Sequence, residues 1–156
     1  MTQPSAPDPE LFESFLPYVL LRLSSALNQK LAVDLAAQQI NIARWRVLAV
    51  LKMRDGQTIG AMAQAAMIEQ SALSRTVTSM AREGLVERRT GSGDQRFVEV
   101  WLLARGRTLF DQLYPIVTRR QDDAVAGLDA REQADLLALL ARVFGNIAGH
   151  GVRSSA

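Results

Sequence analysis

The segment from Gln70 to Leu102 constrains the fold of this chain more than any other. It predicts a helix, a glycine stop at Gly84, and two strands over 85–89 and 96–102 that are joined by the loop TGSGDQ. The apolar positions of the helix recur at i, i+4, i+7 and i+8: Leu73, Val77, Met80 and Ala81. A helix followed by a β-hairpin in this order is typical of a winged helix.

Helices are expected on both sides of this segment. Asp8-Pro9 resembles a helix start, and Pro17 then either kinks that helix or marks its true start. A capping box, Asp129 to Glu132, is expected to begin the last helix. The other expected elements are a helix at 42–53, a short strand at 58–59, a helix at 60–66 and a long helix from about 104.

Composition excludes several classes of protein. The chain of 156 residues has no cysteine, which excludes disulfides and thiol switching. It has no run of about 18 apolar residues, so no membrane span or membrane partner is expected. The first ten residues, MTQPSAPDPE, lack the features of a secretory signal, and we expect a cytoplasmic protein.

Charge is unevenly distributed along the chain. Residues 41–107 carry eleven basic and six acidic residues, a net charge of +5, whereas the remainder has a net charge of −3. A basic middle between acidic flanks indicates a polyanionic partner for the middle, although a plain charged surface would look the same.

The face of the 71–83 helix opposite its apolar stripe combines small or hydroxyl side chains with arginines. Such a face can approach base edges in a major groove, where Ser, Thr and Arg form hydrogen bonds to bases or phosphates. The N–H groups at the helix start could also bind a phosphate. The alternative is an ordinary solvated face. The residues expected to contact DNA are Ser71, Ala72, Ser74, Arg75, Thr78 and Arg82, with Ser79 on the same face.

The expected hairpin adds a thin, basic loop. Its glycines narrow the tip, and arginines on such a tip suit the negative potential of a minor groove. Asp94 is expected to pair with an arginine and shape the loop rather than contact DNA. A plain surface hairpin is the alternative. The further expected DNA contacts are Arg88, Arg89, Ser92 and Arg96.

These residues resemble the MarR family of winged helix-turn-helix regulators. The resemblance lies in the wing signature Asp94-Gln95-Arg96, the run LSRTVTSMAREGLVERR and the helix ARWRVLAVL, with Arg44 where glutamine is common. One departure is Leu103-Ala104, where the family usually has threonine before its next helix. The resemblance implies a mainly α fold with a small β-hairpin wing and an obligate homodimer.

The resemblance also implies a division of the chain. Helical regions at 8–40 and 108–148 would form the dimer, and 41–107 would form the winged helix-turn-helix domain. The first and last helices carry more apolar residues than one small winged domain could cover, which independently favours a dimer. Residues 1–7 and 149–156 are expected to be disordered tails.

The expected function is a homodimeric, sequence-specific regulator of transcription that binds double-stranded DNA. Family habit favours a repressor that a small ligand (an aromatic acid, a phenol or an acyl-CoA thioester) releases from a pseudo-palindromic operator. The alternative is a winged-helix protein-interaction module without DNA readout. An enzyme is not expected, since the chain offers no nucleophile with a base and no phosphate loop.

A ligand pocket is expected between the dimer helices and the winged lobe. Arg22 lies one turn after Tyr18 and could bind a carboxylate, while aromatic rings stack on the ligand. Alternatively, Trp45 and Phe15 belong to the core and Arg22 pairs with the second protomer. No cofactor or metal is expected, and the single histidine is His150. The expected lining is Phe15, Tyr18, Val19, Arg22, Trp45, Leu48 and Tyr114.

Overall fold

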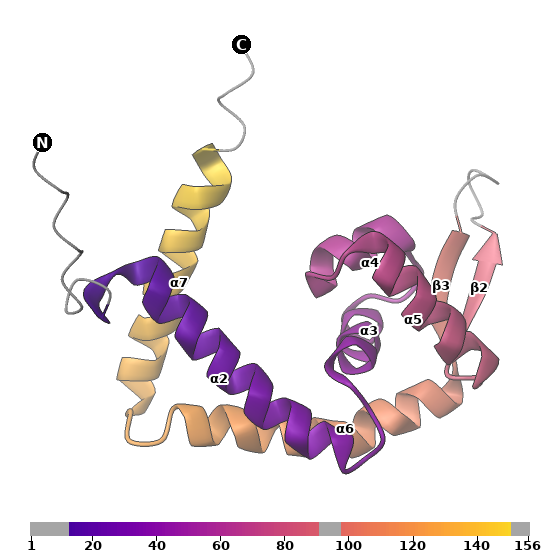
Figure 1. The fold of residues 1–156 in the computed structure, drawn as a ribbon, viewed down its shortest axis with the longest axis horizontal. Helices are drawn as coiled ribbons and strands as arrows, with labels where there is room; N and C mark the ends of the chain where they lie inside the picture. The colour runs from indigo at the N-terminus through magenta and orange to yellow at the C-terminus, as the bar shows by residue number, and fades with distance from the viewer. Residues whose placement is uncertain (1–12, 91–97, 151–156) are drawn as a thin grey trace, which may run out of the picture. The chain divides into compact units, whose positions relative to one another are not determined.

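The computed structural model describes residues 13–90 and 98–150. The elements are α2 (Leu16–Ala36), α3 (Ile42–Met53), β1 (Gln57–Thr58), α4 (Ile59–Ala66), α5 (Gln70–Arg82), β2 (Val86–Thr90), β3 (Val98–Leu102), α6 (Ala104–Ala124) and α7 (Ala130–His150) (Figure 1). The chain divides into two compact units, Met1–Arg120 and Gln121–Ala156. The expected fold class, helical with a small β-hairpin, is confirmed.

Local side chains explain where the helices begin. Pro17 lies in the first turn of α2 and therefore marks its start. Asn41 caps α3, because its side-chain oxygen accepts a hydrogen bond from the Arg44 N–H at 2.9 Å. The expected capping box is present at α7. The Asp129 carboxylate accepts from the Glu132 N–H at 2.9 Å, and the Glu132 carboxylate accepts from the Asp129 N–H at 2.8 Å.

The three strands form one antiparallel sheet in the order β1-β3-β2, as Figure 1 shows for β2 and β3. Strand β1 lies one residue earlier than expected, because the Thr58 hydroxyl caps α4 by accepting from the Ala61 N–H at 3.3 Å. Strand β2 lies one residue later than expected. Its predecessor Leu85 donates its N–H to the Met80 carbonyl at 3.0 Å and so belongs to the turn that ends α5.

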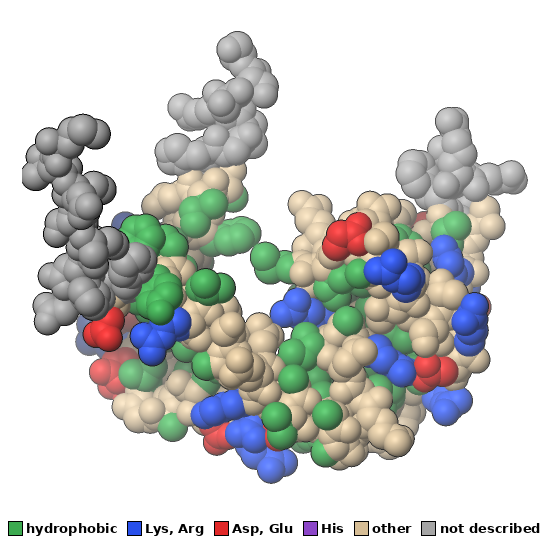
Figure 2. Space-filling view, in the orientation of Figure 1, with side chains coloured by type: hydrophobic (Ala, Val, Ile, Leu, Met, Phe, Trp, Pro, Cys, Tyr) green, Lys and Arg blue, Asp and Glu red, His purple; other side chains and the backbone are tan. Residues whose placement is uncertain are grey.

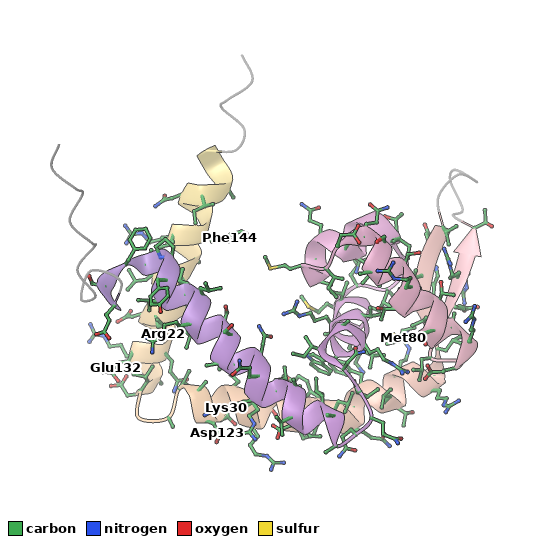
Figure 3. The ribbon with its side chains drawn as sticks, viewed as in Figure 1. Arg22, Lys30, Met80, Asp123, Glu132 and Phe144 are labelled. Carbon is green, nitrogen blue, oxygen red and sulfur yellow. The ribbon has the colours of Figure 1, made fainter. Side chains whose placement is uncertain are left out.

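The core lies between α3, α5 and the inner face of the sheet. The expected apolar stripe of α5 is confirmed: Leu73, Val77 and Met80 are fully buried, and Met80 is labelled in Figure 3. Because this stripe fixes the rotation of α5 about its axis, the opposite face of the helix must point outward. Other fully buried side chains of this core are Leu35, Val47, Leu48, Leu51, Met62 and Val100.

Helices α2 and α7 each leave large apolar side chains exposed, and hydrophobic side chains are visible on the surface in Figure 2. On α2, Leu21 is 63% exposed and Val33 is 72% exposed. On α7, Leu137, Phe144 and Ile147 are exposed by 67%, 69% and 68%. Apolar stripes of this length usually mark an interaction surface.

Of the two expected disordered tails, the structure describes part of one. α7 continues to His150, two residues into the segment 149–156 that the sequence assigns to a tail. Residues 1–7, the other expected tail, and the helix start at Asp8-Pro9 lie outside the described residues.

A glycine allows α6 to approach the turn that follows α5. A Cβ atom at Gly106 would lie 2.2 Å from the Leu85 backbone oxygen and 2.8 Å from Leu102 Cδ1. Gly106→Ala is therefore expected to lower the free energy of unfolding by about 1–3 kcal/mol, measured by urea denaturation.

Gly60→Ala is the matched control, because a Cβ atom at this position in α4 meets nothing within 4 Å. We expect it to leave stability unchanged or to raise it by up to about 1 kcal/mol. Equal stabilities for the two variants would show that α6 does not pack this closely.

Candidate nucleic-acid interface

The start of α5 is capped by a carboxylate. Glu69 accepts hydrogen bonds from the N–H groups of Ser71 and Ala72, each at 2.9 Å, and from the Ser71 hydroxyl. The Ser71 hydroxyl, followed by these two N–H groups, holds the pKa of the Glu69 carboxyl at about 2, and the charge of Arg75 also lowers it. A negative charge at a helix N-terminus is also favoured by the helix dipole.

This cap corrects one expectation. The N–H groups of Ser71 and Ala72 were expected to be able to bind a phosphate, but the Glu69 side chain already occupies both. The sequence-based interpretation missed Glu69 because it assigned residues 68–71 to a turn. An acidic residue directly before the expected helix was the available signal.

The outward face of α5 presents two arginines two turns apart. Arg75 and Arg82 are both exposed, and their spacing of seven residues places them on the same face. Within residues 13–90 and 98–150, neither forms a hydrogen bond or an ion pair. Thr78 and Ser79 lie between them in the sequence, and the first is half-buried and the second exposed, so the side chains between the two guanidinium groups on this face are small. The structure therefore brings together the middle and the end of the predicted contact face.

Arg88 and Arg89 lie on opposite faces of the sheet, because successive strand residues alternate. Arg88 Nη1 donates to the Thr78 hydroxyl of α5 at 3.4 Å, so this arginine joins the predicted helix face. Arg89 instead pairs with Glu87, and its guanidinium lies 4.9 Å from the ring centre of Trp101. Only one of these two predicted contacts is therefore adjacent to α5. Ser92, Asp94 and Arg96 lie outside the described residues, and their roles remain predictions.

The end of α5 is held by a second carboxylate. Glu83 caps the helix, forms an ion pair with Arg44 of α3 and accepts from the Ser79 hydroxyl at 3.2 Å. Arg105 of α6 donates to the Glu83 backbone oxygen at 2.9 Å. The hydrogen bond and charge of Arg44 lower the pKa of the Glu83 carboxyl, which keeps it ionised. These contacts join the last turn of α5 to two other helices.

The predicted ligand-lining residues have different environments. Trp45 and Leu48 are buried in the core, 8% and 0% exposed, which agrees with the core alternative for Trp45. Phe15, which caps α2, and Tyr18 and Val19 on α2 are exposed, so Phe15 does not belong to the core of a single chain. Arg22 stacks on Tyr18, with its guanidinium carbon 5.7 Å from the ring centre.

Tyr114, the last of the predicted ligand-lining residues, belongs to a stack of three aromatic rings. The rings of Trp45 and Phe110 are 5.2 Å apart, and those of Phe110 and Tyr114 are 5.5 Å apart. The sequence-based interpretation omitted Phe110, although its spacing of four residues from Tyr114 on a helix was a usable signal. These three rings do come together; the structure does not show all seven predicted residues lining one depression.

Neither a metal site nor a membrane-spanning helix is found in the described part of the chain. Residues 13–90 and 98–150 contain no group of three or more His, Asp or Glu side chains placed to hold a metal ion. None of the helices over those residues combines the length and the hydropathy needed to span a bilayer.

The sequence and the fold are similar to those of known regulators of transcription. The model of the MarR family matches residues 38–96. A MarR-family transcriptional regulator from Silicibacter pomeroyi is 33% identical, with a TM-score of 0.80 over 87% of this chain and 92% of that one. A second regulator of that family from Silicibacter pomeroyi is 28% identical, with a TM-score of 0.81 over 93% of this chain and 99% of that one.

A more distant structure shares the fold. A mutant MarR from E. coli, solved in complex with operator DNA, is 24% identical, with a TM-score of 0.73 over 82% of this chain and 92% of that one.

The Glu69 cap predicts a specific dependence of stability on pH. Since the pKa of Glu69 falls from 4.5 to about 2 on folding, its stabilising effect is present above pH 4.5 and is lost as the pH falls toward 2. At pH 6, wild type should therefore unfold at a higher urea concentration than Glu69→Gln. The difference between the two urea midpoints should shrink as the pH falls from 4.5 to 3.

Ser71→Ala is the companion variant, because it removes the hydroxyl donor and keeps both N–H donors. It should retain part of the pH dependence. A difference between wild type and Glu69→Gln that stays constant across this pH range would contradict the cap.

Proposed function

The chain belongs to the MarR family of transcriptional regulators, and we propose that it acts in the cytoplasm as a homodimer that binds specific sequences of double-stranded DNA. The shared fold with an E. coli MarR solved on operator DNA supports this proposal. The family and the similar structures are regulators of transcription rather than enzymes.

The outward face of α5 is the observation that carries the proposal. Arg75 and Arg82 are exposed and form no side-chain hydrogen bond or ion pair within the described residues. The side chains that lie between them on the outward face are small. Arginine in this setting can donate two hydrogen bonds to guanine O6 and N7 in the major groove.

The wing would add contacts beside this face. Arg88 donates to Thr78 of α5, and this contact supports the proposal that Arg88 binds a phosphate at the edge of the groove. Arg96 and Ser92 are proposed to contact the minor groove from the tip, with Asp94 shaping the loop. Arg89 is the weakest of the proposed contacts, because it is held by Glu87 and Trp101 on the other face of the sheet.

Dimerisation through α2 and α7 is supported by their exposed apolar side chains. Leu21, Leu137 and Phe144 are each more than 60% exposed in a single chain. Burying such side chains against a second copy is favourable by about 25 cal/mol per Å² of apolar surface. Two copies of α5, related by a two-fold axis and about one helical turn of DNA apart, would then read a pseudo-palindromic operator.

Repression, with release by a small organic ligand, completes the proposal. A ligand shifts such an equilibrium only as far as its affinities for the two states differ. The aromatic stack of Trp45, Phe110 and Tyr114 offers one apolar surface near which an aromatic ligand could bind.

DNA binding is tested with single arginine variants. Arg75→Ala and Arg96→Ala are each expected to weaken binding to a duplex from the region upstream of the protein's own gene by about tenfold or more. Fluorescence anisotropy at two salt concentrations measures the loss.

Arg131→Ala on α7 is the control. It removes one arginine whose side chain is 91% exposed and which is distant in sequence from residues 41–107, the expected winged helix-turn-helix domain. If Arg75→Ala bound the duplex as tightly as this control, the proposal would be wrong and a protein-interaction module would become the better reading.

The dimer is tested at Phe144. Because Phe144 is 69% exposed within one chain, Phe144→Asp should leave the helical content of the protein unchanged while it disrupts association. We expect light scattering to show a monomer for Phe144→Asp and a dimer for wild type and Arg131→Ala. Circular dichroism serves to check that each variant is folded. A wild type that is monomeric at a protein concentration of tens of micromolar would contradict the proposal.

A further inference from the structure

Three side chains form a cluster on the face of the sheet that points away from the core: Glu87 and Arg89 of β2 and Trp101 of β3. Glu87 and Trp101 are directly opposite each other across the two strands, and Arg89 is diagonal to Trp101. The neighbours of Trp101 along β3, Val100 and Leu102, point to the other face and are 0% and 5% exposed. We call the three side chains the outer cluster.

Trp101 joins the outer cluster to the turn that follows α3. A Cβ atom added at Gly56 would lie 2.5 Å from Trp101 Cζ2, so the indole ring lies directly against the backbone of this turn. The Gly56 N–H donates to the Val100 carbonyl at 3.1 Å, and the Asp55 side chain accepts from the Leu102 N–H at 2.8 Å. Strand β3 is therefore fixed to this turn on both sides of Trp101.

Strand β2 has less support than β3. In the order β1-β3-β2 it lies at an edge, and within the described residues it pairs with β3 alone. Cross-strand side-chain contacts add to the stability of such a pair. Arg89 supplies this contact on the outer face, because its guanidinium carbon lies 4.9 Å from the centre of the Trp101 ring. Glu87 pairs with the same guanidinium group.

The contact between Arg89 and Trp101 depends on the ring and not on the indole N–H group. Trp101 Nε1 is buried and has no hydrogen-bond partner within residues 13–90 and 98–150. A guanidinium group near the face of an indole ring is attracted by the negative potential of that face. Loss of the ring should therefore release Arg89 from β3, whereas loss of the N–H group alone should not.

Arg88 is the residue whose direction this contact determines. Successive residues of a strand point to opposite faces, so Arg88 points toward α5 when Arg89 is held in the outer cluster. Its Nη1 atom donates there to the Thr78 hydroxyl at 3.4 Å. This hydrogen bond is long and exposed, and it contributes little by itself to holding β2.

We propose that Arg89 is a positioning residue. Through Trp101 it holds β2 on β3 so that Arg88 faces the DNA bound by α5, and it does not contact DNA itself. A direct contact would require Arg89 to leave both Glu87 and Trp101. The inference rests on the proposed function and replaces, for Arg89 alone, the DNA contact proposed above.

The salt dependence of DNA binding separates a positioning role from a phosphate contact. Loss of one phosphate contact lowers the slope of log K against log salt concentration by about 0.9. Anisotropy with the upstream duplex is measured between about 50 and 200 mM salt. Arg88→Met should lower the slope by about one. Arg89→Met should weaken binding about threefold and leave the slope unchanged.

Trp101→Leu is the matched variant on the other strand. It should weaken binding at least as much as Arg89→Met, and Arg89→Met should add little in the Trp101→Leu background, because both changes remove one contact. Trp101→Phe keeps an aromatic ring without the indole N–H, and Arg89→Lys keeps a cation, so each should recover most of the affinity. Arg131→Ala is the control for loss of a distant charge. Circular dichroism serves to check folding, and the slope of Arg89→Met decides the question even if Trp101→Leu does not fold.

The failure of this inference is distinguishable from failure of the proposed function. A slope for Arg89→Met that falls as far as that of Arg88→Met would show a direct contact and overturn the positioning role, while the proposed function would stand. The same conclusion would follow if Arg89→Met bound as tightly as Arg131→Ala, or if the losses from Arg89→Met and Trp101→Leu were additive. A wild type that bound no duplex would overturn the proposed function and the positioning role together.

Discussion

Each end of α5 is held by a carboxylate, and the rest of the interface depends on this arrangement. Glu69 occupies the N–H groups of the first turn, and Glu83 ties the last turn to α3 through Arg44. Between these ends, Leu73 and Met80 anchor the helix in the core. The axis and the rotation of α5 are therefore both determined before any partner arrives, so little ordering free energy remains to oppose binding.

Patterns that repeat along one element were predictable from the sequence. The buried stripe of α5 follows from apolar periodicity, because burial of one helix face imposes a repeat of 3.6 residues. Strands β1 and β2 were displaced by one residue, since the cap at Thr58 and the turn at Leu85 depend on which backbone groups the neighbouring helix leaves unpaired. These hydrogen bonds depend on the three-dimensional packing of the elements and not on a local sequence pattern.

The candidate site was predictable only in part, for the same reason. The exposure of Arg75 and Arg82 on one face was predictable, because an exposed helix face is a local property. The separation of Arg88 from Arg89 follows from strand alternation and could have been anticipated. The contact of Arg44 with Glu83 joins residues 39 positions apart, and no local pattern reveals it. Sequence reasoning likewise assigned Trp45 to a pocket wall without Phe110, the ring that covers it.

The outward face of α5 is free of the packing that determines the fold. A change at Ser74, Arg75 or Arg82 would leave the buried stripe and both carboxylate contacts intact. Natural variation at these positions is consequently under little pressure from stability, in contrast to Gly106, where the Leu85 backbone leaves no room for a side chain. If this face reads DNA as proposed, copies of such a chain that arise by gene duplication can diverge in the DNA sequence they recognise while keeping one scaffold. The same separation makes this face a suitable region for a combinatorial library.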